Sequence, residues 1–342
     1  MVVSAAAIPR VVWKLCSVAW TGGRIRFAPG GPASSPPGRS AAGAAGAAGA
    51  AGAAGAGGLM LPALPFPPEQ LAVPGSVRLL HLFEARYLAL LEACQRQPSS
   101  PERPRPLLVH LSVAEAEDPL GVAGWEVQKE ACLLCELLDF RQVDLGVLAT
   151  VRAVDQVFVD TVEGGEEPYL QARATPVRRE VGGGQAAWSA AQPVAEQAAR
   201  MKAVLGDTLE LSRKLVDTGV PAPAEAGSLS PEELPDEIRD EMLRGGNLAG
   251  EALRQLPLEQ ALAWAEEAGG ADGGVEGAAR LGWAALQPSP GASGEETEEL
   301  VLRRMFGLEA ETLSERLDLC QEYAEECRSR LAAKVALMSL KL

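Results

Sequence analysis

The chain has 342 residues, and its 31 basic and 46 acidic side chains give a net charge of −15. The charge is unevenly placed: residues 1–68 carry five cations and no acid, whereas the remainder carries 26 basic against 46 acidic side chains, a net charge of −20. An acidic body repels phosphate backbones, which disfavours general nucleic-acid binding. No apolar run reaches the roughly 18 residues of a membrane-spanning helix, and six cysteines fit a reducing compartment better than a disulfide scaffold.

Residues 1–58 are expected to lie outside the fold. They contain no Asp or Glu, five Lys or Arg, several serines and an Ala-Ala-Gly tract that begins at Ala41. An acid-free, Arg- and Ser-bearing, Ala-rich start is typical of an organellar transit peptide, and the tract is typical of a flexible low-complexity spacer. A merely disordered tail is the alternative. We therefore expect a disordered N-terminal leader over 1–58.

The stretch 61–77 is rich in proline. Proline lacks the amide donor and restricts φ, so this stretch is expected to run extended along a sheet edge, neither as a helix nor as a central strand, and to turn at Pro74-Gly75. A helix follows that should end near Gln97, because prolines come next. Its apolar stripe recurs at helical spacing: Phe83, Tyr87, Leu90, Leu91 and Cys94.

Short segments rich in β-branched or large apolar residues fill 107–180, separated by turn residues. They predict an antiparallel sheet or small barrel whose strand order the pattern leaves open. The expected strands are Leu107–Val113, Ala131–Leu138, Val147–Val154, Gln156–Val162 and Tyr169–Val177.

The chain beyond Gly184 is expected to be helical. Helices are predicted over 194–216, from Ser230 to about Gly245, over 251–268, over 275–287 and within 295–340. The last region holds a packing seam in steps of three and four: Leu313, Leu317, Cys320, Ala324, Cys327, Leu331, Val335 and Met338. Small residues at several of these positions favour packing inside a helical bundle over a dimeric coiled coil.

Catalytic motifs are missing from the sequence. None of the six lysines follows a glycine, so no P-loop is present. The two histidines, His81 and His110, lie outside any HExxH pattern, and His81 is expected to pack or to make a local hydrogen bond. Cys132 and Cys135 have the spacing of half a zinc site, but the other half is absent and the leucines between them favour a buried strand. We expect no catalytic residue, cofactor or metal site.

One segment resembles a known family. Residues 66–87, FPPEQLAVPGSVRLLHLFEARY, are similar to the opening of the Lon protease N-terminal domain, and the Pro-Tyr-Leu at 168–170 is similar to a later strand of that family. Ala72-Val73 and Leu79 depart from the family's usual residues. The matching positions, expected to be mainly structural, are Phe66, Pro67, Pro74, Gly75, Leu80, His81, Phe83, Glu84, Arg86, Tyr87, Pro168 and Tyr169.

The resemblance implies an α+β fold: a PUA-like antiparallel β-barrel over 59–182, followed by an α-helical bundle region over 187–342. It also implies a protein that recognises unfolded or degron-bearing clients. Lon proteases carry an ATPase and a protease domain after this module, and neither fits in this chain. The chain is thus similar to stand-alone Lon-domain proteins of plants and algae, which predicts a non-catalytic adaptor for protein clients or a protease or chaperone partner.

The chloroplast is the expected location, with the mitochondrion as the alternative. Within the stretch 61–73, an exposed proline-rich edge is the expected peptide-binding surface. Two other functions stay open: an enzyme with an unrecognised acidic site, and an RNA-binding PUA-like protein. The RNA-binding reading depends on a basic patch around Arg173, Arg178 and Arg179, and the acidic body argues against it.

Overall fold

The structure is a computed structural model. It describes residues 18–21, 24–27, 58–100, 104–117, 123–129, 131–164, 167–177, 186–224, 255–270 and 274–340, with short pieces between 228 and 240. Most of the expected leader, much of the helix expected from Ser230 and the pair Arg178 and Arg179 lie outside the described residues.

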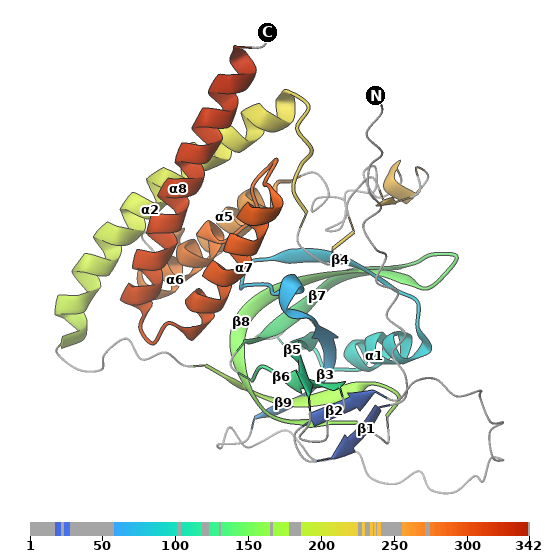
Figure 1. Ribbon diagram of the computed structural model, residues 1–342. Coiled ribbons are helices and arrows are strands. Elements are labelled where there is room, and N and C mark those ends of the chain that lie inside the picture. Colours follow the sequence, from blue (N-terminus) through green and yellow to red (C-terminus); the bar gives the residue numbers. More distant parts are fainter. Residues whose placement is uncertain are drawn as a thin grey trace, which may run out of the picture.

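Five strands pair in a closed ring (Figure 1). They are β3 (Leu59–Phe66), β5 (Leu107–Glu117), β7 (Cys132–Gln142), β8 (Val147–Glu163) and β9 (Leu170–Pro176). β3 pairs with β5 and β9, β9 with β8, β8 with β7, and β7 with β5, which returns the ladder to its start. The β3–β5 pair is parallel and the other four pairs are antiparallel. Closure leaves these strands without the free edges of an open sheet.

Four further strands extend this sheet. β4 (Val77–Leu82) pairs with β8, and β6 (Ala123–Val127) pairs with β5. β1 (Val18–Thr21) and β2 (Arg24–Phe27) form a hairpin, and β2 pairs with β6. These two strands differ from the expectation that all of residues 1–58 lie outside the fold. Four-residue strands are too short to stand out in an acid-free, Ala-rich sequence, and they need a distant partner to form.

The expectation that the proline-rich stretch lies at a sheet edge is wrong for β3, which is paired on both sides. Its first half pairs with β9 and its second half with β5, and Ala63 is the position that both registers share. Pro62 and Pro65 therefore each face a partner strand on one side only. A proline is tolerated in such a place because its missing N–H can point away from the ladder.

The expected strands Val147–Val154 and Gln156–Val162 are one continuous strand, β8. The pairing register with β7 shifts between Leu134 and Cys135, opposite the junction of the two expected strands. A bulge of this kind bends a strand without ending it, so the polar Asp155 looked like a break in the sequence. β6 had no counterpart among the expected strands.

The turn and the first helix agree with the sequence. Gly75 has φ of 91°, and the Ser76 amide donates to the Val73 carbonyl at 3.0 Å, as in a type II turn. The short helix η1 (Pro68–Gln70) precedes this turn, and α1 (Ala85–Gln95) follows β4. α1 ends close to the predicted Gln97 and buries its apolar residues Leu90, Leu91 and Cys94.

The remaining helices pack beside the sheet (Figure 1). They are α2 (Ala186–Asp217), α5 (Pro257–Glu267), α6 (Gly274–Ala285), α7 (Gly294–Glu309) and α8 (Leu313–Ser339). α2 lies along α8, which buries its predicted seam from Leu313 to Leu331. The helical region predicted within 295–340 is two helices, because Thr312 caps α8 by accepting from the Glu315 amide at 3.2 Å, and the predicted seam lies within α8.

Helices and sheet share one hydrophobic core. A single cluster of buried side chains runs from Leu80 and Val151 in the sheet to Trp264, Leu281 and Cys320 in the helices. The turn at Gly75 contacts α5 so closely that an added Cβ would lie 2.8 Å from the Trp264 ring. The regions predicted as 59–182 and 187–342 are therefore packed together rather than merely joined.

Candidate functional site

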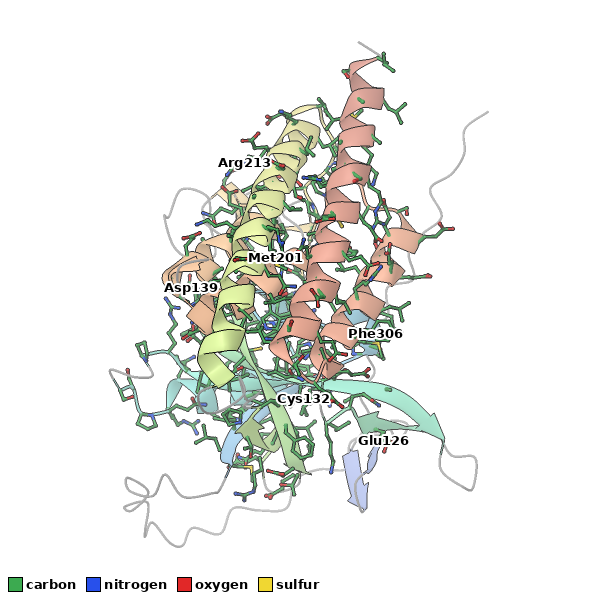
Figure 2. The ribbon with its side chains drawn as sticks, turned by 90° about the vertical axis from the view of Figure 1, so that its left-hand side faces the viewer. Glu126, Cys132, Asp139, Met201, Arg213 and Phe306 are labelled. Carbon is green, nitrogen blue, oxygen red and sulfur yellow. The ribbon has the colours of Figure 1, made fainter. Side chains whose placement is uncertain are left out.

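A groove of about 460 Å³ lies between the sheet and the last turns of α7. The helix contributes Met305, Leu308 and Glu309, whereas the opposite wall comes from β5, β6 and the chain that follows β6. Figure 2 shows Phe306 and Glu126 on the same side of the molecule. We name this feature the α7–β6 groove; its lining is Pro68, Leu71, Ser112, Ala114, Glu126, Val127, Gln128, Lys129, Ala131, Met305, Leu308 and Glu309.

Long-range hydrogen bonds hold α7 against the sheet. The buried Arg304 donates from Nη1 to the Leu71 carbonyl at 2.8 Å and from Nε to the Leu286 carbonyl at 3.0 Å. Near the end of α7, the Gln156 side-chain amide donates to the Leu308 carbonyl at 2.9 Å. Bonds to a buried charged donor are among the stronger ones in proteins. Both walls of the groove are therefore positioned by the fold itself.

α7 presents apolar side chains to solvent beside the groove. Leu302 is 53% exposed, Met305 38% and Phe306 53%. Their spacing of three and four places them on one helical face, which we name the α7 apolar face. The opposite side of α7 is used for packing, where Leu300 and Leu308 are buried. A helix that is buried on one face and apolar on another has a surface available for a further apolar contact.

The groove has an apolar floor and a mixed rim. Ala114, Val127 and Met305 supply apolar surface, and the charged lining residues are Glu126, Lys129 and Glu309. Its size and composition fit an extended apolar stretch of a few residues. Two acids against one base at the rim favour a segment that carries positive charge.

The residues of the family signature fall into several separate places. The first is inside the sheet, where the Phe66 ring stacks on His110 with centroids 4.2 Å apart and Arg78 lies 5.3 Å from the Phe66 centroid. Leu80 is buried in β4. Pro67 is the residue before η1, and Pro74-Gly75 forms the turn against Trp264.

The second place is the junction of β4 and α1. His81 is exposed, and its Nε2 lies 2.5 Å from the Leu145 carbonyl, which it must reach as a donor. Glu84 pairs with Arg86. Two aromatic signature residues differ in burial here. Tyr87 packs against the main core, whereas Phe83, expected in the apolar stripe of the helix, is 53% exposed.

Phe83 is exposed because it lies between β4 and α1, outside the helical stripe that was expected to include it. The tip of the β7–β8 hairpin covers its backbone: a Cβ on Gly146 would lie 2.7 Å from the Phe83 Cα. In the later signature, Tyr169 packs against the main core and Pro168 is exposed.

His110 is a buried neutral histidine. Arg78 donates from Nη1 to its Nε2 at 3.1 Å and from Nη2 to the Gln70 carbonyl at 2.5 Å. Burial, and secondly the Arg78 guanidinium, hold the pKa of His110 well below its usual range. The ring lies inside the sheet, stacked on Phe66, so its role is structural and it gives the groove no acid or base.

The described cysteines are buried in the core. They are Cys94, Cys132, Cys135, Cys320 and Cys327. Burial raises the pKa of Cys132 and of Cys135 to about 12, which makes both thiols poor metal ligands at neutral pH. Within the described ranges, no group of three or more His, Cys, Asp or Glu side chains could hold a metal ion. The same residues include no helix that could cross a membrane.

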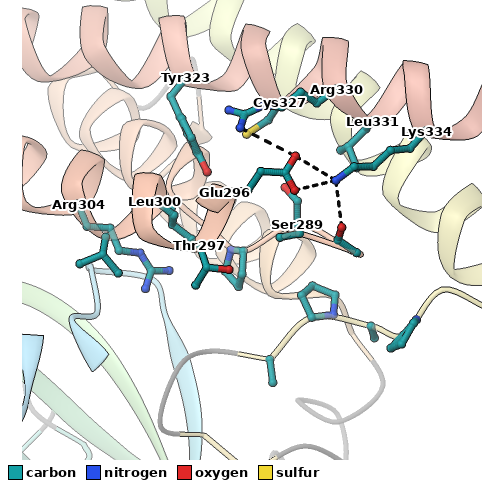
Figure 3. Close-up of a pocket in the computed structure, with 18 residues that line it drawn as sticks. Ser289, Glu296, Thr297, Leu300, Arg304, Tyr323, Cys327, Arg330, Leu331 and Lys334 are labelled. Carbon is teal, nitrogen blue, oxygen red and sulfur yellow. Dashed lines mark hydrogen bonds and ion pairs between the residues drawn. The ribbon is translucent and has the colours of Figure 1, made fainter. Parts of the chain in front are cut away.

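A second cavity, of about 420 Å³, lies between α7, α8 and the loop at Pro221–Ala224 (Figure 3). Lys334 donates to both carboxylate oxygens of Glu296, at 2.8 and 3.0 Å, and to the Gly291 carbonyl at 3.0 Å. Arg330 pairs with Glu299 at 2.8 Å. These ion pairs join α7 to α8. Because the charged groups named here are paired with one another, the α7–β6 groove is the better candidate for a ligand.

Sequence reasoning missed most of the groove. Of the proline-rich stretch expected to bind peptides, Pro68 and Leu71 do line it, but Leu61, Ala63 and Leu64 are buried. The α7 apolar face had a usable signal, because Leu302, Met305 and Phe306 recur at three and four. The sequence places these three residues within the predicted helical region 295–340 and assigns them no surface.

No protein-family model and no curated protein matches this chain. Among solved structures it is similar to the N-terminal domain of the Lon protease from the Mycobacterium avium complex, at 15% identity over 78% of this chain and 98% of that one, with a TM-score of 0.31. It is also similar to a Lon N-terminal domain protein from Xanthomonas campestris, at 19% identity over 60% of this chain and 98% of that one, with a TM-score of 0.26. Both likenesses are loose, so the function of the site is argued from its own residues.

Proposed function

We propose that this chain is a non-catalytic protein-recognition module of the Lon N-terminal kind, with a PUA-like barrel and a helical bundle. It holds extended apolar segments of unfolded or degron-bearing protein clients in the α7–β6 groove. The observation that carries the proposal is the exposure of Leu302, Met305 and Phe306 beside a groove of about 460 Å³. Binding of this kind needs no reacting group, and we propose that the clients pass to a protease or chaperone partner.

The compartment is part of the same proposal. An acid-free start with five cations supports delivery to an organelle, the chloroplast or alternatively the mitochondrion. Imaging of the full chain with a fluorescent protein at its C-terminus tests this. A signal that stays diffuse and outside both organelles would contradict it.

Binding is tested with the full chain and a fluorescein-labelled apolar decapeptide, followed by fluorescence anisotropy. Met305→Asp and Phe306→Asp place a charge on the α7 apolar face, and Leu337→Asp is the matched control, because Leu337 is 61% exposed on α8 and outside the groove. Losing one buried apolar side chain costs about 1.5–3 kcal/mol, so we expect each of the two α7 variants to bind the peptide about tenfold or more weakly. Leu337→Asp should bind as the wild type does.

Thermal unfolding of the same variants separates loss of binding from loss of fold. We expect all three to unfold near the wild-type temperature, because each replaces a side chain that is already partly exposed. A wild-type chain that binds no apolar peptide, or α7 variants that bind as well as Leu337→Asp does, would overturn the proposed function.

A further inference from the structure

The outer edge of β6 adjoins the α7–β6 groove. On its inner side β6 pairs with β5, from Val113 opposite Val127 onward. On its outer side it pairs with β2, where Arg24 stands opposite Glu126 and Ile25 opposite Trp125. Glu126 therefore belongs both to the groove lining and to the pairing with the chain's own N-terminal hairpin.

An outer strand edge is a natural binding surface. It presents a row of backbone N–H and C=O groups that any extended segment can pair with, whatever its side chains. β2 is four residues long, and two of its residues are paired with β6. A contact this short can be replaced by a longer segment, because each added residue pair adds hydrogen bonds to the ladder.

Charge favours the segment that occupies the edge. Residues 1–68 carry five cations and no acid, against a net charge of −20 for the rest of the chain. The register makes Arg24 the Cα partner of Glu126, so a cationic residue of this segment stands at an acidic position of β6. β2 reads Arg-Ile-Arg-Phe, so the occupant is extended, partly apolar and cationic.

We propose that the outer edge of β6 is a strand-addition site, held in the full chain by Arg24–Phe27 and open to client segments of the same chemistry once β2 leaves. This inference rests on the proposed function, since it assigns the client an antiparallel pairing with β6 and a cationic, apolar composition. Loss of the N-terminal segment, as transit-peptide removal would cause, removes β2 and leaves the outer edge of β6 free to pair with a client.

The covalent link between β2 and the rest of the chain explains why β2 competes well with a client segment for the edge of β6. Only residues 28–57 separate β2 from the described chain that begins at Gly58. A covalent link holds a segment near its site at an effective concentration that can reach about millimolar, far above that of a dilute client. Occupancy by β2 therefore weakens client binding without needing strong contacts.

The test uses full-length chains and a fluorescein-labelled peptide with the sequence of residues 19–28, AWTGGRIRFA, in an anisotropy titration. Ile25→Pro in the protein removes an amide donor from β2, and Ala47→Pro makes the same change in the Ala-Ala-Gly tract as the matched control. With the tethered competitor weakened, we expect Ile25→Pro to bind the peptide about tenfold more tightly than the wild type and Ala47→Pro do.

A second peptide, in which Arg24→Glu and Arg26→Glu reverse the charge, tests composition. It should bind Ile25→Pro several times more weakly than the first peptide does, and the difference should shrink at high salt because exposed charges are screened. Equal binding of both peptides, or equal affinity of wild type and Ile25→Pro, overturns the strand-addition site. If either result is found while Met305→Asp still weakens peptide binding, the strand-addition site fails but the proposed function stands. If no chain binds any peptide, the proposed function fails as well.

Discussion

Arg304 of α7 donates from Nη1 to the carbonyl oxygen of Leu71 at 2.8 Å, although 233 positions separate the two residues. This bond joins α7 to the chain just after η1. Leu71 lines the α7–β6 groove, and Arg304 is next to Met305, which also lines it. The groove thus depends on a contact between segments that lie far apart in the sequence.

Replacing Arg304 should destabilise the whole protein. Arg304→Met removes a buried donor and leaves the Leu71 and Leu286 carbonyls without that partner, so we expect the free energy of unfolding to fall by about 3 kcal/mol. The control is Arg328→Met, which breaks an exposed ion pair with Asp207 and should cost less than about 1 kcal/mol. Urea unfolding measures both, and equal costs would contradict the role given to Arg304.

Gly75→Ala should be strongly destabilising. The residue has φ of 91°, and its Cβ would lie 2.8 Å from the Trp264 ring. Positive φ alone costs about 1–3 kcal/mol for a residue other than glycine, and the contact adds to it. Gly206→Ala is the control within α2, where a Cβ meets nothing within 4 Å and should stabilise the helix by about 0.5–1 kcal/mol. Thermal unfolding would show opposite shifts for the two variants.

His110 should make stability depend on pH. Its pKa is lowered in the folded state by burial and by Arg78, so the unfolded chain binds the proton more readily. Stability from this group is complete above the unfolded pKa of about 6.5 and is lost as the pH falls below it, by at most about 1.4 kcal/mol per pH unit.

His110→Gln should reduce the loss of unfolding free energy between about pH 6.5 and 5. His81→Gln, which changes the exposed histidine, is the control. Urea unfolding at several pH values gives the slope. A slope that His110→Gln leaves unchanged, or that His81→Gln removes, would show that His110 is not the group responsible.

The buried cysteines should resist thiol reagents in the native protein. Burial raises the pKa of Cys94, Cys132, Cys135 and Cys320 to about 12, and the thiolate is the reactive form. In a Cys16→Ser chain, which removes the thiol outside the described residues, a chromogenic disulfide at pH 8 should react slowly. Unfolding in guanidinium should release all five thiols at once, and a fast native reaction would contradict their placement in the core.

Local patterns in the sequence predicted local structure well. The stripe of Leu90, Leu91 and Cys94 identified α1, and the seam from Leu313 to Leu331 identified the buried face of α8. The Pro74-Gly75 pair predicted its turn, because a type II turn requires positive φ at its third position, which suits glycine, and favours proline at its second. Each of these features depends on residues within a few positions of one another.

The candidate site depended on residues far apart. Pro68, Glu126 and Met305 come together because η1, β6 and α7 meet at one end of the sheet. The exposure of Phe83 and Phe306 could not be read from their periodicity, since an apolar residue gives the same pattern whether a partner covers it or not.

The sequence by itself determined where most helices and strands form, that no P-loop is present, and that an acid-free start precedes an acidic body. Only the tertiary structure decided that β3 is central, that β2 pairs with β6, and that Met305 faces a groove. Long-range contacts decide which strands pair and which helix faces are buried. The spacing of side chains along the chain does not specify those contacts.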